Sequence, residues 1–532
     1  MHSIVFTLIY YYNKKDGTQK SLPLCKLAAP PDYIFLTEYL LIMNTTTVSN
    51  DIQETEPTYK RAHIWQIGFF SLNTCATNLY LAMMAYVSYY ANGIAGISVV
   101  MISMLLTVMR VFNGITDPIV GYIIDKTHGR FGKFRPFMLI GNLLLAVSCI
   151  LLYFTTHHIP VFLRIPYFIL VYGLFIVAFT FQTAVTKSAQ SIITNDPKQR
   201  PICTFFDSTF ISAAYGGVAL YVSARLIPHY GSFNNPKLFA EFIIVTVVLS
   251  MLCTMFAIIG IWSKDKDENF VLPQGPGHEN AVTIHAYLDV LRHNRPIQML
   301  VIAASTDKFA SVVYSHAAVT VMMYGIIMNN YSIYGLIGII TAVPSLLIVV
   351  FGISLARHFG QRKVLIWFTW ASIVFQTVIG LLLLSDNIST VSLKHINLIT
   401  ILFFTVFAIL NGCKSITNNM VIPMIADCTD YELYRSGRFV PGLMGALFSF
   451  VDNFVSSLGT AFVGIMLSII GFGNAFPQVG DAMTPLILWS TIFFYCVTPI
   501  IGWIISLISM QYYRLDKKRM EDIVRELNKS KG

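Results

Sequence analysis

Charged side chains are scarce in this chain. Asp, Glu, Lys and Arg make up 12% of its 532 residues, while 55% of the residues are hydrophobic. Because a soluble domain carries about 25% charged residues, a surface so poor in charge must face something other than water. The net charge of +9 does not indicate a nucleic-acid partner, since Lys and Arg lie between apolar runs and form no basic stripe beside aromatic residues. The composition predicts a protein embedded in the lipid bilayer.

Paired cysteines and catalytic motifs are also missing. The eight cysteines occur singly, with no C-x-x-C pair and none at metal-binding spacing from a His. They are typical of small apolar side chains in helices, so we predict no metal site and no cofactor. H-E-x-x-H, G-x-S-x-G and P-loop motifs do not occur either, which predicts that the protein is not an enzyme.

The beginning of the chain lacks the features of a signal peptide. A short apolar stretch, Ile4 to Tyr12, follows an N-terminus without Lys or Arg and is too short to cross a bilayer. Residues 44–57 are polar, as in a cytosolic tail. We expect residues 1–62 to be an extension and cytosolic tail, of which residues 1–42 are weakly ordered.

Long apolar runs are abundant. An α-helix needs about 20 apolar residues to cross a bilayer, and the chain has twelve such runs: 64–90, 98–124, 136–155, 165–193, 203–227, 238–262, 296–326, 332–355, 364–384, 396–426, 441–470 and 483–510. The longest stretch between runs, 263–295, divides them into six and six. We predict an all-α membrane protein with a six-helix bundle at 63–262, a cytosolic central loop at 263–295, a second six-helix bundle at 296–510 and a cytosolic tail at 511–532.

Basic residues concentrate in alternate loops. One side of the predicted membrane holds most of them: Lys60, Arg61, Lys126, Arg130, Lys133, Arg135, Lys198, Arg200, Lys264, Lys266, Arg292, Arg295, Arg357, Arg362, Lys363, Arg435, Arg438 and the tail from Arg514 to Lys531. The loops on the other side hold only Arg164, Lys237 and Lys394. Since Lys and Arg favour the cytosolic side, we predict that both termini are cytosolic and that the protein resides in the plasma membrane.

The two halves resemble each other at one loop. The turn at 125–135 after the second run has a shorter counterpart at 356–363 after the eighth, and both combine Gly with basic residues. This repetition indicates duplicated bundles. Transporters of that design bind their solute near the midplane and rock one bundle against the other.

Three motifs match one family. The first reads Arg110-Val-Phe-Asn113-Gly-Ile-Thr-Asp117-Pro-Ile-Val-Gly and continues through Asp125, Thr127, Arg130 and Gly132-Lys133-Phe-Arg135-Pro. The others are Asn195-Asp-Pro-Lys-Gln-Arg200 and Ala426-Asp-Cys-Thr-Asp-Tyr-Glu-Leu-Tyr-Arg435-Ser-Gly-Arg438. With these motifs the chain resembles the glycoside-pentoside-hexuronide:cation symporter family, the family of melibiose permease. The resemblance implies the major facilitator fold and cation-coupled transport of a sugar.

The family's cation-binding residues are only partly present. In the family, carboxylates from helices one and two hold the coupling cation. The second acid of helix two matches Asp117, but Asn113 stands at the first. Helix one has no acid between Ile64 and Asn92, and its polar candidates include Thr74 and Asn78. A proton needs only one acid. Since only one of the family's cation-binding acids is matched here, the resemblance favours a proton over sodium as the coupling ion.

The family's sugar-binding residues are also replaced. Its acid on helix four falls near Thr183, and its arginine on helix five falls near Ser208. Its helix-eleven lysine falls at or beside Asn453, next to Asp452. The candidates for solute contact in this chain are Lys187, Thr183, Asp207, Asn78 and Thr74.

Several charges lie inside the predicted membrane, where ionisable residues are functional candidates by default. At 1.5 Å per residue, Asp117, Lys187 and Asp207 lie about 8 to 12 Å from the cytosolic ends of their helices. Lys187 and Asp207 form either a structural ion pair that closes an inner gate or, for Lys187, a contact for an anionic solute. Arg110 lies deeper on helix two, and we expect His316 to be a core histidine rather than a proton relay.

A second set of charges lies deeper. Asp307, Lys414 and Asp452 all lie about 16 to 18 Å from the cytosolic boundary. They form either a proton-carrying network or a static triad that fixes the second bundle. Asp125, Arg130, Lys133 and Arg135 belong to the turn after helix two, where we expect an inner-gate motif that latches the domains and caps helices.

These observations favour a monomeric carrier that moves a sugar or a related glycoside, pentoside or hexuronide by alternating access. Two alternatives remain: a carrier for a non-sugar anionic or amphipathic solute, and a transport-inactive sensor on the same fold. Nothing in the residues names the solute.

Overall fold

The computed structural model describes residues 62–126, 131–132, 134–193, 199–265, 292–385, 387–393, 395–437 and 441–529, all within the unit Tyr59–Gly532. Regular structure in these ranges is entirely helical. Arg130, Lys133 and the expected extension up to residue 61 lie outside the described residues, as do the side chains of Asp117, Asp125, Lys187 and Asp452.

The first half of the chain forms helices in all six predicted runs. They are α3 (Ile64–Met84) with α4 (Val87–Gly93), α5 (Val99–Lys126), α6 (Arg135–Thr155) with the 3-10 turn η2 (Thr156–His158), α7 (Val161–Ile193), α8 (Arg200–Tyr221) with the π-helix η3 (Val222–Leu226) and α9 (Ile227–Tyr230), and α10 (Pro236–Ile261). We call these helices the first group.

The second half repeats the arrangement and adds a helix at its end. Its elements are α12 (Arg295–Tyr314) with α13 (Ala317–Thr320) and η5 (Val321–Ile327), α14 (Ser332–Phe359), α15 (Gln361–Leu383), the 3-10 turn η6 (Ile388–Thr390), α16 (Leu398–Ser436), α17 (Pro441–Leu467) with η7 (Ser468–Phe472), α18 (Pro485–Ile492) with η8 (Phe493–Val497) and α19 (Thr498–Tyr512), and finally α20 (Lys517–Lys529). The helices from α12 to α19 form the second group.

Nine helices of the described residues are long and apolar enough to cross a membrane, and α12 with α13 and η5, bent by 55°, would make a tenth. Neither α3 nor α5 belongs to this set. The middle of α3 carries polar side chains such as Asn73, and within the described side chains α5 contributes the shorter apolar helix Val99–Asn113. The chain is therefore a multi-pass membrane protein, while the number of twelve spans stays a prediction.

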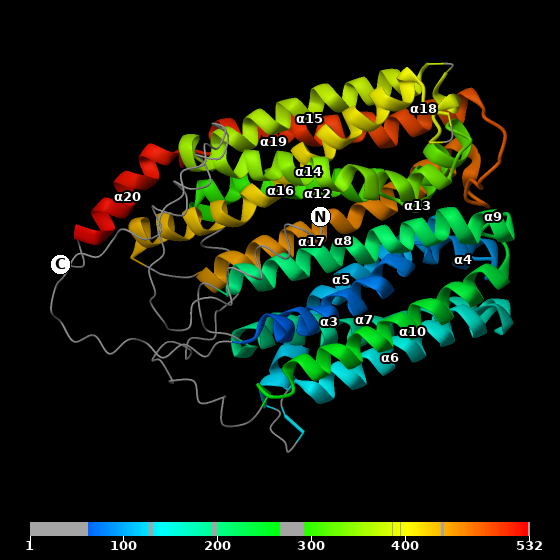
Figure 1. Ribbon diagram of the computed structural model, residues 1–532, viewed down its shortest axis with the longest axis horizontal. Coiled ribbons are helices and arrows are strands. Elements are labelled where there is room, and N and C mark those ends of the chain that lie inside the picture. Colours follow the sequence, from blue (N-terminus) through cyan, green and yellow to red (C-terminus); the bar gives the residue numbers. More distant parts are fainter. Residues whose placement is uncertain are drawn as a thin grey trace, which may run out of the picture. The chain divides into compact units, whose positions relative to one another are not determined.

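Helices of the same group pack closely, for example α3 on α10 and α8, or α12 on α19 and α17 (Figure 1). The two groups meet along two helix pairs, α5 with α17 and α8 with α14. Glycine allows this approach: a Cβ at Gly335 would collide with the Leu220 backbone, and one at Gly464 would collide with Ser103. Side chains larger than hydrogen at these two positions would force the groups apart.

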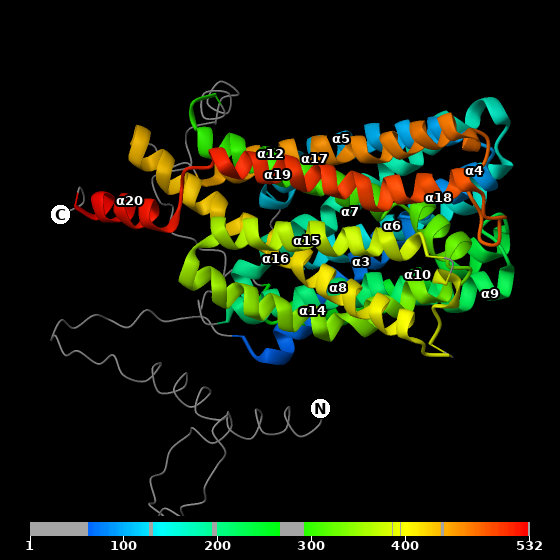
Figure 2. The ribbon, with the colours of Figure 1, turned by 90° about the horizontal axis from the view of Figure 1, so that it is seen from above.

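The helices present two different ends. Figure 1 shows α4, α9, α13 and α18 near one end, which we call the low-charge end, and α20 at the other, which we call the basic end. The view from above in Figure 2 shows α20 at this end, beside the last turns of α16. The predicted cytosolic side corresponds to the basic end.

Candidate functional site

Three predicted solute-binding residues meet between α3 and α8. The hydroxyl of Thr74 donates a hydrogen bond to Oδ1 of Asp207 over 3.0 Å. Nδ2 of Asn78, one turn further along α3, donates to the backbone oxygen of Thr74 over 2.8 Å. Spacing by four residues places both side chains on one helical face, so an acid, a hydroxyl and an amide share one place inside the first group.

A buried amide extends this cluster to α7. Nδ2 of Asn73 donates to Thr186 Oγ1 over 2.9 Å and lies 3.4 Å from the backbone oxygen of Gln182. Thr186 directly precedes the predicted candidate Lys187. The amide therefore fixes α3 against the part of α7 that carries Lys187.

Asn113 on α5 forms a hydrogen bond with a side chain of α7. Its Oδ1 accepts a hydrogen bond from Thr180 Oγ1 over 3.2 Å, and the hydroxyls of Thr180 and Thr116 lie 3.0 Å apart. Thr183, one turn after Thr180, bonds through Oγ1 to the backbone oxygen of Phe179 over 3.1 Å. Neutral oxygens thus lie next to the α5 turn that carries Asp117, and the described residues include no group of three His, Cys, Asp or Glu that could hold a metal ion.

Arg110 carries an exposed guanidinium in the middle of α5. Within the described part of the chain it has no hydrogen bond and no ion pair, but it interacts electrostatically with Tyr172 on α7, Tyr215 on α8 and His316 from the second group. Neighbours on three other segments place this charge between the helices rather than toward lipid. A cation inside the membrane without a carboxylate partner among the described residues calls for water or an anionic ligand.

His316 is held at one of its two ring nitrogens. Its Nδ1 accepts the backbone N–H of Ala318 over 3.2 Å and so caps α13. The side chain is half-buried. One ring nitrogen is therefore satisfied within the fold, and the core role stays a prediction.

Two of the three deep charges of the second group, Lys414 and Asp307, have described surroundings. The Lys414 ammonium lies 4.0 Å from the ring centre of Tyr314 and 5.5 Å from that of Trp503, a cation–π arrangement. Ser506 Oγ lies 3.4 Å from Asp307 Oδ2. No described carboxylate lies within ion-pair distance of Lys414, so a network with Asp452 stays a prediction.

The start of α6 is anchored by an acid that the sequence did not single out. Asp265, fully buried just after α10, accepts the backbone N–H groups of Phe134 (3.1 Å) and Arg135 (3.0 Å). Arg135 Nε reaches the same carboxylate over 3.3 Å, and its guanidinium stacks on Trp262 at 4.5 Å. A carboxylate at a helix N-terminus is stabilised by the helix dipole, so Asp265 caps α6, and this partner of Arg135 belongs to the first group.

The second group has its own buried acid at the basic end. Glu432, near the end of α16, accepts hydrogen bonds from Asn294 Nδ2 (2.9 Å), Arg435 (2.9 Å) and Ser436 Oγ (2.9 Å). Asn294 also caps α12, whose Ile297 N–H it accepts over 3.1 Å. Glu432 therefore ties the third sequence motif to the start of the second group.

At the low-charge end, the segment between η7 and α18 closes onto the first group. Nδ2 of Asn92 donates to the backbone oxygen of Asn474 (2.8 Å), and its Oδ1 accepts the N–H of Phe476 (3.0 Å). Tyr89 donates its hydroxyl to the oxygen of Pro477 over 2.7 Å. These bonds, which we call the outer seal, join the two groups.

Comparisons with known proteins agree with this architecture. Residues 69–517 match the family model described as MFS/sugar transport protein. The putative glycoside/cation symporter YagG of Escherichia coli is 24% identical over 474 residues, covering 88% of this chain and 95% of its own. The isoprimeverose transporter of Lactiplantibacillus pentosus is 22% identical and covers 84% and 88%. The uncharacterized symporter YnaJ of Bacillus subtilis is 23% identical over 88% of this chain and 95% of its own.

Solved structures share the fold. The nucleoside transporter NupG superposes with a TM-score of 0.55 at 9% identity, covering 85% of this chain and 99% of its own. A D-xylose-proton symporter gives 0.51 at 14% identity, over 84% and 97%. At such identities only the major facilitator fold is shared. With the family model spanning most of the described helices, the chain is a secondary transporter that belongs to the MFS/sugar transport protein family, of the glycoside-pentoside-hexuronide:cation symporter type.

Proposed function

We propose that the protein carries a sugar or a related glycoside, pentoside or hexuronide by alternating access, coupled to a cation. The observation that carries this proposal is the Thr74–Asp207 hydrogen bond together with Asn78, within a polar cluster that draws on four helices. Sugars offer many hydroxyls, and a carboxylate, an amide and hydroxyls supply matching acceptors and donors. Family membership supports the substrate class.

Each predicted residue then has a role. Asp207, Thr74, Asn78, Thr183 and Lys187 contact the solute. Asp117 with Asn113 takes the coupling cation, and a proton is favoured because Asn113 contributes no charge. The motif Asp125, Arg130, Lys133 and Arg135 supports the inner gate, and Asp307, Lys414 and Asp452 form the charge set of the second group.

The outer seal supports one state of the transport cycle. Since the low-charge end is closed by Asn92 and Tyr89, the solute leaves this state through the basic end. With both termini cytosolic in the plasma membrane, the state is inward-facing. The protein acts as a monomer.

Uptake into proteoliposomes tests the substrate class. We expect Asp207→Asn to lower the uptake of the transported sugar at least tenfold, because the amide no longer offers a charged acceptor to the solute. The control is Thr209→Ala on the same helix, whose exposed hydroxyl bonds only to the Phe205 oxygen of its own helix. Full uptake by Asp207→Asn would contradict the site. No uptake of any tested solute under any ion gradient would favour the sensor.

The coupling ion is tested by Asp117→Asn. We expect normal membrane insertion, little accumulation against a gradient and retained solute exchange, because only the proton-binding group is lost. In the parent protein, uptake should follow a pH gradient more than a sodium gradient. Strict sodium dependence at constant pH would show that neutral ligands suffice.

A second candidate function is transport of an anionic solute, and Arg110 favours it. Its guanidinium, which has no ion pair among the described residues, would offset a carboxylate of the solute. We expect a hexuronate to compete with the labelled solute better than its uncharged sugar, and Arg110→Gln to abolish this preference. Lys237→Gln, an exposed cation at the start of α10, is the control. Equal competition by both sugars in the parent protein would exclude this candidate.

A further inference from the structure

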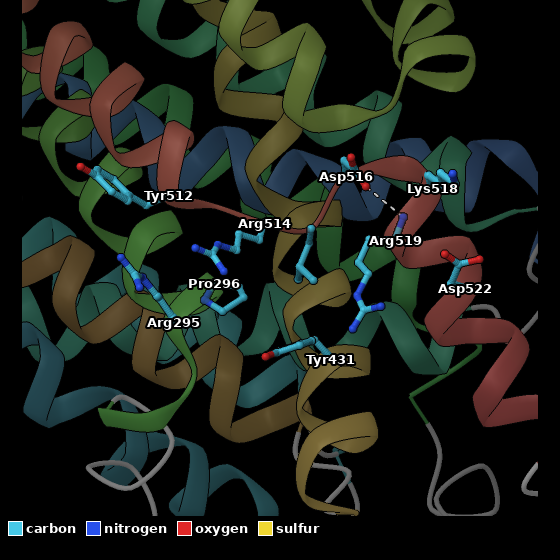
Figure 3. A pocket seen from close by; sticks show the side chains of 10 residues that line it. Arg295, Pro296, Tyr431, Tyr512, Arg514, Asp516, Lys518, Arg519 and Asp522 are labelled. Atoms are coloured by element: carbon cyan, nitrogen blue, oxygen red, sulfur yellow. Dashed lines mark hydrogen bonds between the residues drawn. The ribbon is translucent and has the colours of Figure 1, made fainter.

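A pocket of about 610 Å³ opens at the basic end where the last long helix of the second group stops. It lies between the starts of α12 and α20 and the ends of α16 and α19. Figure 3 shows Arg295 and Arg514 on one side of it, and Arg519 with Asp516 on the other. The pocket is separate from the polar cluster of the first group.

The pocket is rich in uncompensated positive charge. Arg295, Arg514, Lys518 and Arg519 line it, against two acids. One of these acids, Asp516, is engaged in accepting the Arg519 N–H over 2.9 Å at the start of α20. None of the four cations has an ion pair with a described carboxylate.

Aromatic side chains position two of the cations. The Arg295 guanidinium lies 5.5 Å from the ring centre of Tyr512, and that of Arg519 lies 6.0 Å from the ring centre of Tyr434. Cation–π contacts hold the guanidiniums in place without neutralising them. They therefore stay available to an anion.

Apolar surface continues from the pocket along α19. Ile501, Ile505, Ile508 and Tyr512 are each between 38% and 50% exposed, and their spacing places them on one face of the helix. This face leads along α19 to Tyr512, which lines the pocket together with Arg514. A ligand that fits both surfaces has an anionic head and an apolar tail.

We propose that this pocket binds the phosphate-bearing headgroup of an anionic phospholipid whose acyl chains lie along α19. Basic residues directly after a membrane helix attract anionic lipids with about 1 kcal/mol per Lys or Arg. Docking of α20 completes the site: its Ile523 is buried against the second group, and the start of the helix brings Lys518 and Arg519 to the pocket. The lipid thus fastens the end of the chain to the transporter.

Native mass spectrometry of the full-length protein, released from membranes of phosphatidylcholine and phosphatidylglycerol, tests the proposal. We expect the parent to retain phosphatidylglycerol selectively, and Arg514→Gln to weaken this retention roughly fivefold, the factor that corresponds to about 1 kcal/mol. Arg295→Gln should act similarly. The matched control is Lys363→Gln, which removes one exposed charge at the basic end outside the pocket.

Two further arms identify the ligand. Inorganic phosphate at the concentration of the lipid should not displace phosphatidylglycerol; displacement would show a site for free phosphate and overturn the lipid assignment. Equal retention of both lipids, or unchanged retention in Arg514→Gln and Arg295→Gln, would also overturn it and leave the pocket to a soluble acidic partner. Size-exclusion elution like that of the parent confirms that the variants are folded.

Discussion

Each group anchors an arginine at its basic end, and the two anchors differ in charge. Arg135 in the first group bonds to the buried carboxylate of Asp265. Arg362, near the start of α15 in the second, donates instead to the backbone oxygens of Met510 (3.0 Å) and Gln511 (3.4 Å) at the end of α19. Arg135 thus joins the start of α6 to the segment just after α10, and Arg362 joins the start of α15 to the end of α19. The two arginines occupy corresponding positions. In the first group the acceptor is a carboxylate, and in the second group the acceptors are backbone carbonyl oxygens.

The acid of the second group serves a different pair of helices. Glu432 joins α16 to α12, whereas Asp265 joins α10 to α6. Both carboxylates are fully buried and contact the start of a helix. The duplicated halves therefore keep one buried acid each but place it at different helix joints, so the contribution of each anchor to stability should differ.

The largest effect is expected for Asp265→Ala. This change leaves Arg135 and two backbone N–H groups without their acceptor, and breaking a buried pair costs about 3 to 5 kcal/mol. Thermal unfolding of the purified protein in detergent should show a marked fall in Tm. The control is Asp516→Ala, which removes only an exposed helix cap worth about 1 kcal/mol. Equal losses in the two variants would contradict the anchoring role.

An intermediate effect is expected for Glu432→Gln. The amide keeps the shape and one acceptor but loses the charge that faces Arg435, whose side chain is 29% exposed and can turn to water. We expect a loss of about 2 kcal/mol, within the range for a hydrogen bond to a charged group. The same thermal measurement applies. A loss as large as that of Asp265→Ala would mean that the two acids are equivalent after all.

The smallest effect is expected for Arg362→Gln. Its hydrogen bonds to backbone oxygens reach a helix C-terminus that is partly open to water, so we expect about 1 kcal/mol. Lys363→Gln, with an exposed neighbouring side chain, should leave Tm unchanged. If Arg362→Gln destabilised the protein more than Glu432→Gln, backbone dipoles would be the stronger anchor.

The sequence was sufficient to locate the helices but not all of their irregularities. Apolar runs predict a helix wherever a bilayer must be crossed, and every predicted run contains one. The bend between α12 and α13 and the π-helical segments such as η5 depend on packing between runs, which no single run encodes. The helix α20 was missed in the predicted tail, although Met520, Ile523 and Leu527 recur at helical spacing, because its charges dominate the composition.

The sequence proposed the members of the candidate site, which stay a prediction, but not the partners that several polar residues have in the fold. Asp207 was proposed because it is a charge inside the predicted membrane, and Thr74 because it is a polar residue of helix one; the structure adds a hydrogen bond between them. The role of Asp265 was not predicted, because it contacts a residue 130 positions earlier in the chain. The sequence does not distinguish it from the other acids of the same charged loop. The aromatic contacts of Lys414 were not predicted either, because Tyr314 and Trp503 lie on helices distant in the sequence.

The outer seal also sets how often the protein visits its other conformation. The two hydrogen bonds between Asn92 and the segment before α18, with that of Tyr89, contribute about 1 kcal/mol each. Together they bias the closed form by about 3 kcal/mol, or a population ratio of roughly one hundred to one. A solute that binds the opposite conformation a hundredfold more tightly equalises the two populations. The stronger the outer seal, the larger the difference in solute affinity between the two conformations that is needed to open it.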